Sequence, residues 1–262
     1  PSDSPPGRKR LVMRSLNIRE SDALRAATRA AGATTLNAVQ LAWGLVLSRW
    51  TGQPVVDFGL VDSGRSLLPG LDRTVGCLIS TLPMRISLEG DCGLAAMLAT
   101  LRQTTLAMRP HSHASPTEVR RWAGLAGRTT LFDTIVMYSR ATLEGRMRKL
   151  GGVWADWTVR LIEEGAAPLT LAVADEPELQ ILIEHDPARV PDATAHALTD
   201  QVARLLQAMA TAAPDRPLGT LDMLGADDRA ELLALGQPDQ TLPADPPCIA
   251  TRFETLAARQ PE

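Results

Sequence analysis

Residues 34–86, TTLNAVQLAWGLVLSRWTGQPVVDFGLVDSGRSLLPGLDRTVGCLISTLPMRI, carry the strongest pattern in this chain. Residues 36–52 are apolar nearly all round and end in glycine, which predicts a buried helix with a C-terminal stop. Residues 55–61 are rich in β-branched side chains and predict a strand, followed by a loop at 62–70. A second extended stretch, 75–89, contains Pro83. Because a β-sheet tolerates proline only in an edge strand or at a bulge, we expect the middle of this stretch to be irregular.

The flanking sequence alternates between helical and extended patterns. A strand at 11–18 leads into a helix at 22–32, for which Ser21-Asp22 offers a cap. Four strands are expected late in the chain, the last two joined by a tight turn at Asp175-Glu176-Pro177. Further helices are expected at 94–110, 115–127 (with Ser115 as cap) and 192–213, and the late strands at 129–139, 153–163, 169–177 and 178–186. Early interleaving followed by a run of strands predicts an α/β (α+β) sandwich with a mixed sheet covered by helices.

Composition excludes several classes of function. The chain has 262 residues, of which 45% are hydrophobic, enough to fill a real core. Its 27 basic and 30 acidic residues give a net charge of -3, which argues against a nucleic-acid partner. Cys77, Cys92 and Cys248 lack CxxC spacing, so neither a disulfide framework nor a zinc site is indicated, and a reducing, cytoplasmic setting fits best. The longest apolar run, around Leu41 to Leu47, is far shorter than the ~20 residues that span a bilayer, so no membrane segment is expected.

Four histidines are the first candidates for acid–base or metal chemistry. His111 and His113 form an HxH pair without a recognisable third ligand, so a solvated loop is the favoured interpretation and no metal is expected. His185 precedes Asp186 at a strand end, but neighbours on a strand point to opposite faces and do not form a dyad. His196 is expected to be structural, on the terminal helix. No GxSxG, GxxxxGK[ST] or GxGxxG motif is present, so self-contained catalysis is poorly supported.

Two arginines follow turn or strand motifs. Arg65 ends DSGR and Arg85 ends TLPMR, and either guanidinium could clamp an anion. A structural role is favoured for both, in which each side chain bonds loop carbonyls or a carboxylate.

Residues 34–86 resemble the second half of nonribosomal peptide synthetase condensation domains. The family has a buried helix ending in R-x-T-G, a strand D-V-x-F-G, a loop S-G-R and the signature V/I-G-x-F-V-N-T-L-P-x-R. Here the signature runs from Val75 to Arg85, with Leu78 in place of the usual Phe and Ser80 in place of the usual Asn. Further matches are Phe132-Asp133-Thr134 to L-F-D-T, APLTLAV to Y-P-L-x-L-x-V, and FETLAARQPE to the opening of adenylation domains.

The active-site motif of the family, H-H-x-x-x-D-G, belongs to the first half of the domain and does not occur in this sequence. The H-Q-D-x-P-F-E pattern is matched only loosely at His111 and Pro116, so no catalytic role passes to His111.

The resemblance implies a chloramphenicol-acetyltransferase-like lobe, one of two that form a V around a tunnel. It implies a linker or the start of a fragment at 1–10, the C-terminal lobe of the condensation domain at 11–220, an interdomain linker at 221–247 and the start of an adenylation domain at 248–262.

The implied function is peptide-bond formation between a carrier-bound donor and a carrier-bound aminoacyl acceptor. Phosphopantetheine would be delivered by the carrier proteins, with no cofactor bound directly. The partners implied are the N-terminal condensation lobe, the donor and acceptor peptidyl carrier proteins and the downstream adenylation domain. Ser80, Thr81 and Asp133 are the expected tunnel-lining residues, since short polar groups suit the bonding of amides. The alternative, that these side chains satisfy backbone groups at a bulge, stays open.

The motif positions Arg65, Gly76, Pro83 and Arg85 are assigned structural roles. No catalytic residue is expected in this chain, which we expect to be inactive alone. Two alternatives stay open: a non-catalytic scaffold that docks carrier proteins, and the lobe of an epimerisation domain. An HHxxxDG motif upstream would favour the enzyme, and its loss would favour the scaffold.

Overall fold

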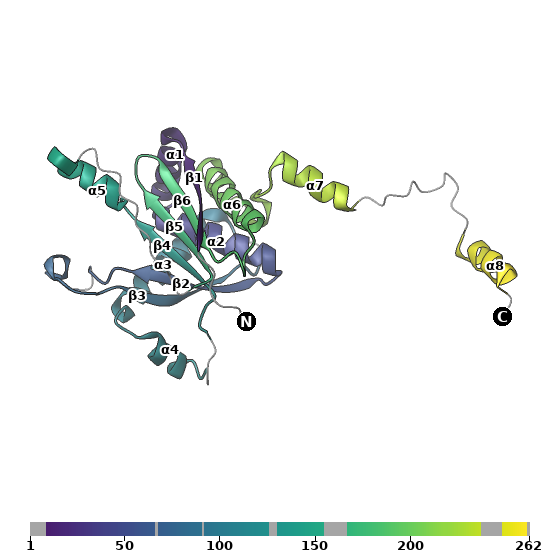
Figure 1. Ribbon diagram of the computed structural model, residues 1–262, viewed down its shortest axis with the longest axis horizontal. Coiled ribbons are helices and arrows are strands. Elements are labelled where there is room, and N and C mark those ends of the chain that lie inside the picture. The colour runs from purple at the N-terminus through teal and green to yellow at the C-terminus, as the bar shows by residue number, and fades with distance from the viewer. Residues whose placement is uncertain are drawn as a thin grey trace. The chain divides into compact units, whose positions relative to one another are not determined.

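The computed structural model describes residues 9–65, 68–90, 92–125, 130–154, 167–236 and 248–260. The chain divides into two compact units, one running to Met223 and one from Leu224 onward, and each is described by itself (Figure 1).

The first unit is built on one six-stranded sheet in the order β1-β6-β5-β4-β2-β3. Strand β4 pairs in parallel with both β2 and β5, and the remaining pairs are antiparallel. The strands are β1 (Arg10–Leu16), β2 (Val55–Asp62), β3 (Ser80–Ser87), β4 (Thr134–Ser139), β5 (Leu169–Asp175) and β6 (Leu179–His185). This confirms the predicted mixed sheet.

Helices α1 (Ile18–Ala30), α2 (Thr35–Thr51) and α6 (Asp192–Thr211) pack on the sheet and on one another (Figure 1). Helix α2 begins at a capping box in which the Thr34 side chain accepts from the Asn37 amide, and it ends at Gly52, whose φ of 68° is left-handed. Eleven of its residues are buried, as its apolar surface predicts. Helix α3 (Leu94–Met108) packs against α2.

The core lies between these helices and the sheet. Strand β6 shows the expected alternation, with inward residues buried and outward residues half-buried. Trp43 of α2 is fully buried and donates its Nε1 proton to Thr134 Oγ1 at 3.1 Å. The largest fully buried side chains are Trp43, Phe58, Leu16, Leu24, Leu41, Met84, Ile86, Leu171, Leu179, Ile181, Ile183 and Leu205.

Pro83 lies in β3, at an edge of the sheet, where the missing amide proton is tolerated. An edge strand is one of the two positions, edge or bulge, that the sequence left open for this proline. The prediction of an irregular middle for residues 75–89 is wrong, because β3 pairs with β2 without interruption from Ser80 to Ser87. Opposite Pro83, Gly59 lies under the Phe132 ring, which would come within 2.5 Å of an added Cβ.

The predicted start of the first helix is also wrong. Asn17 caps α1 through the Glu20 amide, and Glu20 in turn accepts from the Asn17 amide, so the helix begins before Ser21. Ser21 is buried, and its hydroxyl donates to the Leu16 carbonyl oxygen. An Asn-x-x-Glu capping box therefore overrides the Ser-Asp pair.

Late in the unit, the hairpin of β5 and β6 turns at the predicted residues, with Asp175 opposite Leu179. Strand β4 starts at Thr134, later than predicted. Of the strand expected at 153–163, Val153 and Trp154 belong to a short 3-10 helix (Gly152–Trp154), and the rest lies outside the described residues. Helix α4 (Pro116–Trp122) has the predicted Ser115 cap, whereas α5 (Leu143–Leu150) was not predicted.

The second unit contains α7 (Ala226–Gly236) and α8 (Ile249–Arg259).

In the described part of the chain no single helix is long and apolar enough to span a membrane. Helices Ile18–Ala30 and Thr35–Thr51 reach that length and apolar character only when taken together, as a pair bent by 98°.

Candidate functional site

The carboxyl ends of β2, β4 and β5 meet at one edge of the sheet because these strands are parallel. Ligands of α/β sheets commonly bind outside this edge. Asp62, Ser139 and Asp175 are the last residues of the three strands. Ser80, the first residue of β3, lies directly opposite Asp62.

A cavity of about 170 Å³ lies at this edge, between the end of β2 and helices α2 and α3. Its apolar side chains are Leu36, Leu60, Leu82 and Met108, and its polar ones include Asp62, Ser63, Thr105, Arg109 and Tyr138. We call it the edge pocket. An apolar cavity with a few convergent polar groups is the usual form of a small-molecule site.

Two neighbouring polar groups, Asp62 in the edge pocket and Ser80 beside it, have unused bonding capacity. Asp62 Oδ1 accepts the Gly64 amide at 3.0 Å, and no residue in the described ranges forms an ion pair with the Asp62 carboxylate. Ser80 Oγ is buried and has no hydrogen-bond partner among the described residues. A buried hydroxyl without a partner is costly, so this pair marks a place suited to a hydrogen-bonding ligand.

Tyr138 anchors another side of the edge pocket. Its hydroxyl donates to Asp175 Oδ2, while Arg25 Nε donates to Asp175 Oδ1 at 2.8 Å. Burial, followed by the bond to Asp175, raises the pKa of Tyr138 above its usual value, so the phenol remains a protonated donor at neutral pH.

Replacing Tyr138 with phenylalanine is expected to lower the free energy of unfolding by about 1–2 kcal/mol, because the Asp175 carboxylate loses one hydrogen bond. Urea denaturation followed by tryptophan fluorescence measures the change. Ser139→Ala, one residue along and on the opposite face of β4, is the matched control and should stay within about 0.5 kcal/mol. Equal effects of the two substitutions would contradict a role for the Tyr138 bond.

The wall beneath the edge pocket is a polar cluster joining α2 and α3. Gln40 Nε2 donates to Thr105 Oγ1 at 3.1 Å, and Asn37 Nδ2 donates to Gln40 Oε1 at 3.0 Å. Asn37 and Gln40 are buried. A satisfied buried network of this kind holds its members in one arrangement, so the wall is preformed.

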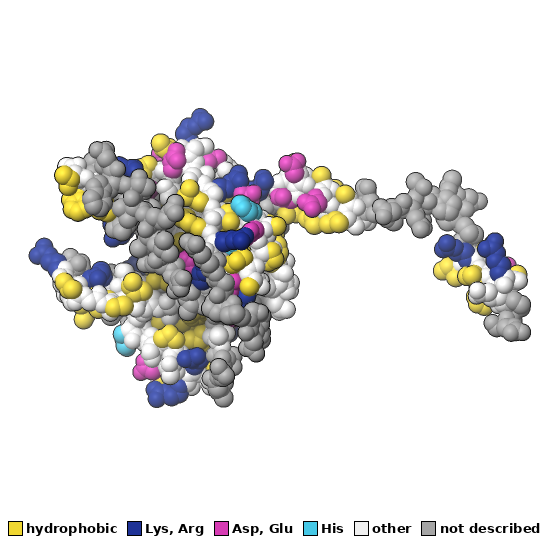
Figure 2. All heavy atoms as spheres, in the orientation of Figure 1, with side chains coloured by type: hydrophobic (Ala, Val, Ile, Leu, Met, Phe, Trp, Pro, Cys, Tyr) yellow, Lys and Arg dark blue, Asp and Glu magenta, His cyan; other side chains and the backbone are white. Residues whose placement is uncertain are grey.

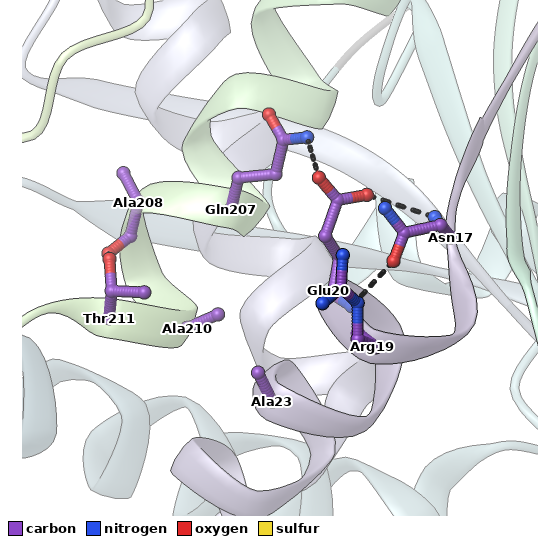
Figure 3. Close-up of a pocket in the computed structure, with 8 residues that line it drawn as sticks. All are labelled: Asn17, Arg19, Glu20, Ala23, Gln207, Ala208, Ala210 and Thr211. Atoms are coloured by element: carbon purple, nitrogen blue, oxygen red, sulfur yellow. Dashed lines mark hydrogen bonds between the residues drawn. The ribbon is translucent and has the colours of Figure 1, made fainter.

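A larger hollow, of about 600 Å³, lies between α1 and α6 (Figure 3). The polar groups there bond to one another: Glu20 accepts from the Asn17 amide at 2.9 Å and from Gln207 Nε2 at 2.9 Å. Capping of α1 accounts for these contacts. The hollow is shallow and open, so we place the candidate site at the edge pocket.

The structure separates the three predicted tunnel-lining residues. Ser80 lies opposite Asp62, beside the edge pocket, but it is not one of the residues that line the cavity. Thr81 pairs with Val61 and points to the opposite face of β3 from Ser80. Asp133 is exposed just before β4, at the strand end away from Tyr138, and its Oδ1 accepts from Thr130 Oγ1 at 3.2 Å. Of the three, only Ser80 lies next to a residue that lines the pocket.

Asp62 and Tyr138 were not predicted as site residues. Both stand near the ends of predicted strands that lie side by side, and that position was the available signal. Their convergence depends on β2 and β4 being parallel neighbours, which local sequence does not state.

Among the motif residues, Arg65 donates to the carbonyl oxygens of Leu71, Thr74 and Gly76 at 3.2, 2.7 and 3.2 Å. It braces the loop that leads into β3. The φ of Gly76, 153°, favours glycine at this point of the loop.

Arg85 forms two hydrogen bonds of 2.8 Å to the two carboxylate oxygens of Asp57, which raises the pKa of Arg85. Both residues are on the face of β2 and β3 away from the helices, and the pair links the edge strand β3 to β2.

The histidines fall on three separate segments of the chain. His111 and His113 are exposed near α4, and the described residues contain no cluster of three or more metal-ligating side chains. His185 is fully buried, bonded through Nδ1 to the Val190 carbonyl oxygen at 2.8 Å, whereas Asp186 accepts from the Ala188 amide. His196 is exposed on α6.

The sequence profile of the condensation domain family matches residues 7–233. The chain belongs to this family. Among curated relatives of this condensation domain chain is a linear gramicidin synthase of Brevibacillus parabrevis, 29% identical over 240 residues. That match covers 87% of this chain and 5% of the relative, so the chain spans a small part of such synthetases. Chondramide synthase of Chondromyces crocatus is also 29% identical, over 219 residues that cover 83% of this chain and 6% of that one.

Solved structures share the condensation domain fold. One is the complex of the X-domain and OxyB from teicoplanin biosynthesis, with a TM-score of 0.70 at 19% identity, covering 87% of this chain and 52% of that one. Another is holo-AB3403, a four-domain nonribosomal peptide synthetase bound to AMP and glycine, with a TM-score of 0.71 at 14% identity, covering 100% and 22%.

Proposed function

We propose that residues 11–220 form the C-terminal lobe of a peptide-bond-forming condensation domain. In this reaction the amine nitrogen of a carrier-bound acceptor attacks the thioester carbonyl carbon of a carrier-bound donor. A C–N bond forms, the C–S bond breaks, and the sulfur leaves as a thiol with the proton that the amine gives up. Both thioesters would arrive on phosphopantetheine arms of carrier proteins, in the cytoplasm.

The observation that carries the proposal is the position of the signature segment. Its residues run from Val75 into β3, where Leu82 lines the edge pocket and Ser80, opposite Asp62, presents a hydroxyl without a partner. The described residues that line the edge pocket include no histidine.

The loops beside the pocket support a partner at the same edge. Leu68, Val75 and Ile79, between β2 and β3, are 62%, 100% and 66% exposed, and Leu150 and Val153, after β4, are 75% and 76% exposed. Figure 2 shows hydrophobic side chains on both projections. Exposed apolar clusters of this kind mark interaction surfaces, and the first lobe is the proposed partner.

A substitution on β3 tests the proposal. In the chain combined with a first lobe that carries HHxxxDG, Ser80→Leu is expected to lower peptide formation from loaded carriers by about tenfold or more, because a bulky side chain displaces the reacting groups. Ser87→Leu, at the other end of β3, is the control and should change the rate less than twofold. Equal rates in both variants would favour the non-catalytic scaffold, and racemisation of the carrier-bound residue without bond formation would favour an epimerisation lobe.

The boundaries at 221–247 and 248–262 form part of the proposal. Prolines at 238, 243, 246 and 247 prevent a continuous helix across this stretch. Limited proteolysis followed by mass spectrometry is expected to cut first between Gly236 and Ala250. First cuts between residues 40 and 220 would place the linker elsewhere.

A further inference from the structure

The bonding groups that line the edge pocket define the ligand it can take. Asp62 has a half-buried carboxylate with one oxygen, Oδ2, free of any hydrogen bond to the described residues. The Tyr138 hydroxyl donates its proton to Asp175, so the Tyr138 oxygen can only accept a further hydrogen bond. Asp62 and Tyr138 therefore offer acceptors only, while the unpaired Ser80 hydroxyl opposite Asp62 can accept as well as donate. The ligand group that matches the Asp62 carboxylate is a hydrogen-bond donor, best of all a cation.

A second charge of opposite sign lies on the same pocket. Arg109, at the end of α3, lines the cavity, is exposed, and makes no ion pair with Asp62. Two opposite charges that border one cavity without pairing suit a ligand that has a cationic end and a neighbouring acceptor such as a carbonyl oxygen.

The apolar part of the pocket limits the size of what lies between these groups. Leu60 and Leu82 face each other across β2 and β3 and are buried, and Leu36 and Met108 close the cavity from the helices. A volume of about 170 Å³ is close to the ~150 Å³ that suffices for a benzene-sized guest in an engineered cavity. The space fits a medium-sized aliphatic or single-ring side chain.

We propose that the edge pocket is the subsite for the acceptor aminoacyl group, with Asp62 binding its α-ammonium, Arg109 its carbonyl oxygen, and the four apolar residues its side chain. The assignment of the ligand as the acceptor rests on the proposed function. Asp62 acts here as a binding and positioning residue, and the pocket selects acceptors with side chains of about leucine or phenylalanine size.

The test is direct binding to the 262-residue chain, independent of peptide formation. The probes are leucinamide, which has the ammonium, the carbonyl and the side chain, and N-acetyl-leucinamide, which lacks the charge. Methyl NMR spectra of the labelled chain report both the affinity and the location, with shifts expected at Leu60, Leu82 and Met108.

Asp62→Asn keeps the shape and removes the charge, so it should weaken leucinamide binding about tenfold or more and leave the weak binding of N-acetyl-leucinamide unchanged. Asp57→Asn, on the same strand but on the opposite face, is the matched control and should bind leucinamide like the unmodified chain. Tryptophanamide should bind at least about tenfold more weakly than leucinamide, because its ring exceeds the cavity. Met108→Trp should abolish binding by filling the space.

Unchanged leucinamide affinity in Asp62→Asn, or shifts confined to the hollow between α1 and α6, would overturn the assignment of the pocket. Failure of the chain with a first lobe to form peptides, with Asp62-dependent binding intact, would instead overturn the proposed function and leave an amine-binding pocket established.

Discussion

The chain alone, supplied with donor- and acceptor-loaded carrier proteins, is expected to form peptide bonds no faster than uncatalysed aminolysis. A positioned general base typically contributes about 10²–10⁴-fold to a reaction of this type. The edge pocket contains a carboxylate but no histidine, and buried His185 is bonded to Val190 in a structural role. The described residues that line the edge pocket therefore offer the amine no imidazole to take its proton.

Mixing the chain with a first lobe that carries HHxxxDG should raise the rate at least about 100-fold. A first lobe with alanine in place of the second histidine of that motif is the control and should give no increase. Product is quantified by mass spectrometry after thioester cleavage. Peptide formation by the chain alone above the background rate would refute the division of labour and direct attention to His111, His113, His185 and His196.

Substitution of Trp43 by alanine is expected to lower the free energy of unfolding by about 3–5 kcal/mol, a large part of the stability of an ordinary domain. Trp43 is fully buried where α2 packs on the sheet, and it also supplies the hydrogen bond to Thr134. The substitution removes both the ring and that bond, and the surrounding side chains can refill the cavity only in part.

Two variants separate these contributions. Trp43→Phe keeps most of the buried area but leaves Thr134 without its donor, so it should cost less than half as much as alanine. Trp122→Ala removes a tryptophan that is 62% exposed on α4 and should stay within about 0.5 kcal/mol. Urea denaturation followed by far-ultraviolet circular dichroism measures all three, and a small effect of Trp43→Ala would show that α2 is not central to the core.

The regular elements were predictable wherever burial imposes a period on the sequence. Helix α2, strand β2 and the hairpin of β5 and β6 followed from runs of apolar residues bounded by Gly52 and by the turn at Pro177. Helix α5 was missed because its segment, LEGRMRKL, is short and mostly polar, and its three apolar residues at helical spacing, Leu143, Met147 and Leu150, are too few to establish a period.

The site was less predictable than the fold. Sequence reasoning selected Ser80, Thr81 and Asp133 as short polar groups, but faces and strand ends decide which of them meet. Alternation sends Thr81 away from Ser80, and Asp133 precedes a strand whose far end holds Tyr138. Asp62 and Tyr138 are brought together by a parallel pairing of β2 with β4 across more than 70 residues of chain, which no local pattern encodes.

The pairing of β1 with β6 has a consequence for biosynthesis. Lys9, just before β1, is bonded to Glu184 of β6, 175 residues later in the chain. At a translation rate of about 5–20 residues per second, roughly 9–35 seconds pass between the synthesis of β1 and that of its partner strand β6. During that interval Val12 and Leu16, which become buried only in the finished sheet, stay exposed on the nascent chain. Of the six strands of this sheet, the first to be synthesised is thus among the last to be paired, and ribosome-associated chaperones have this segment to protect.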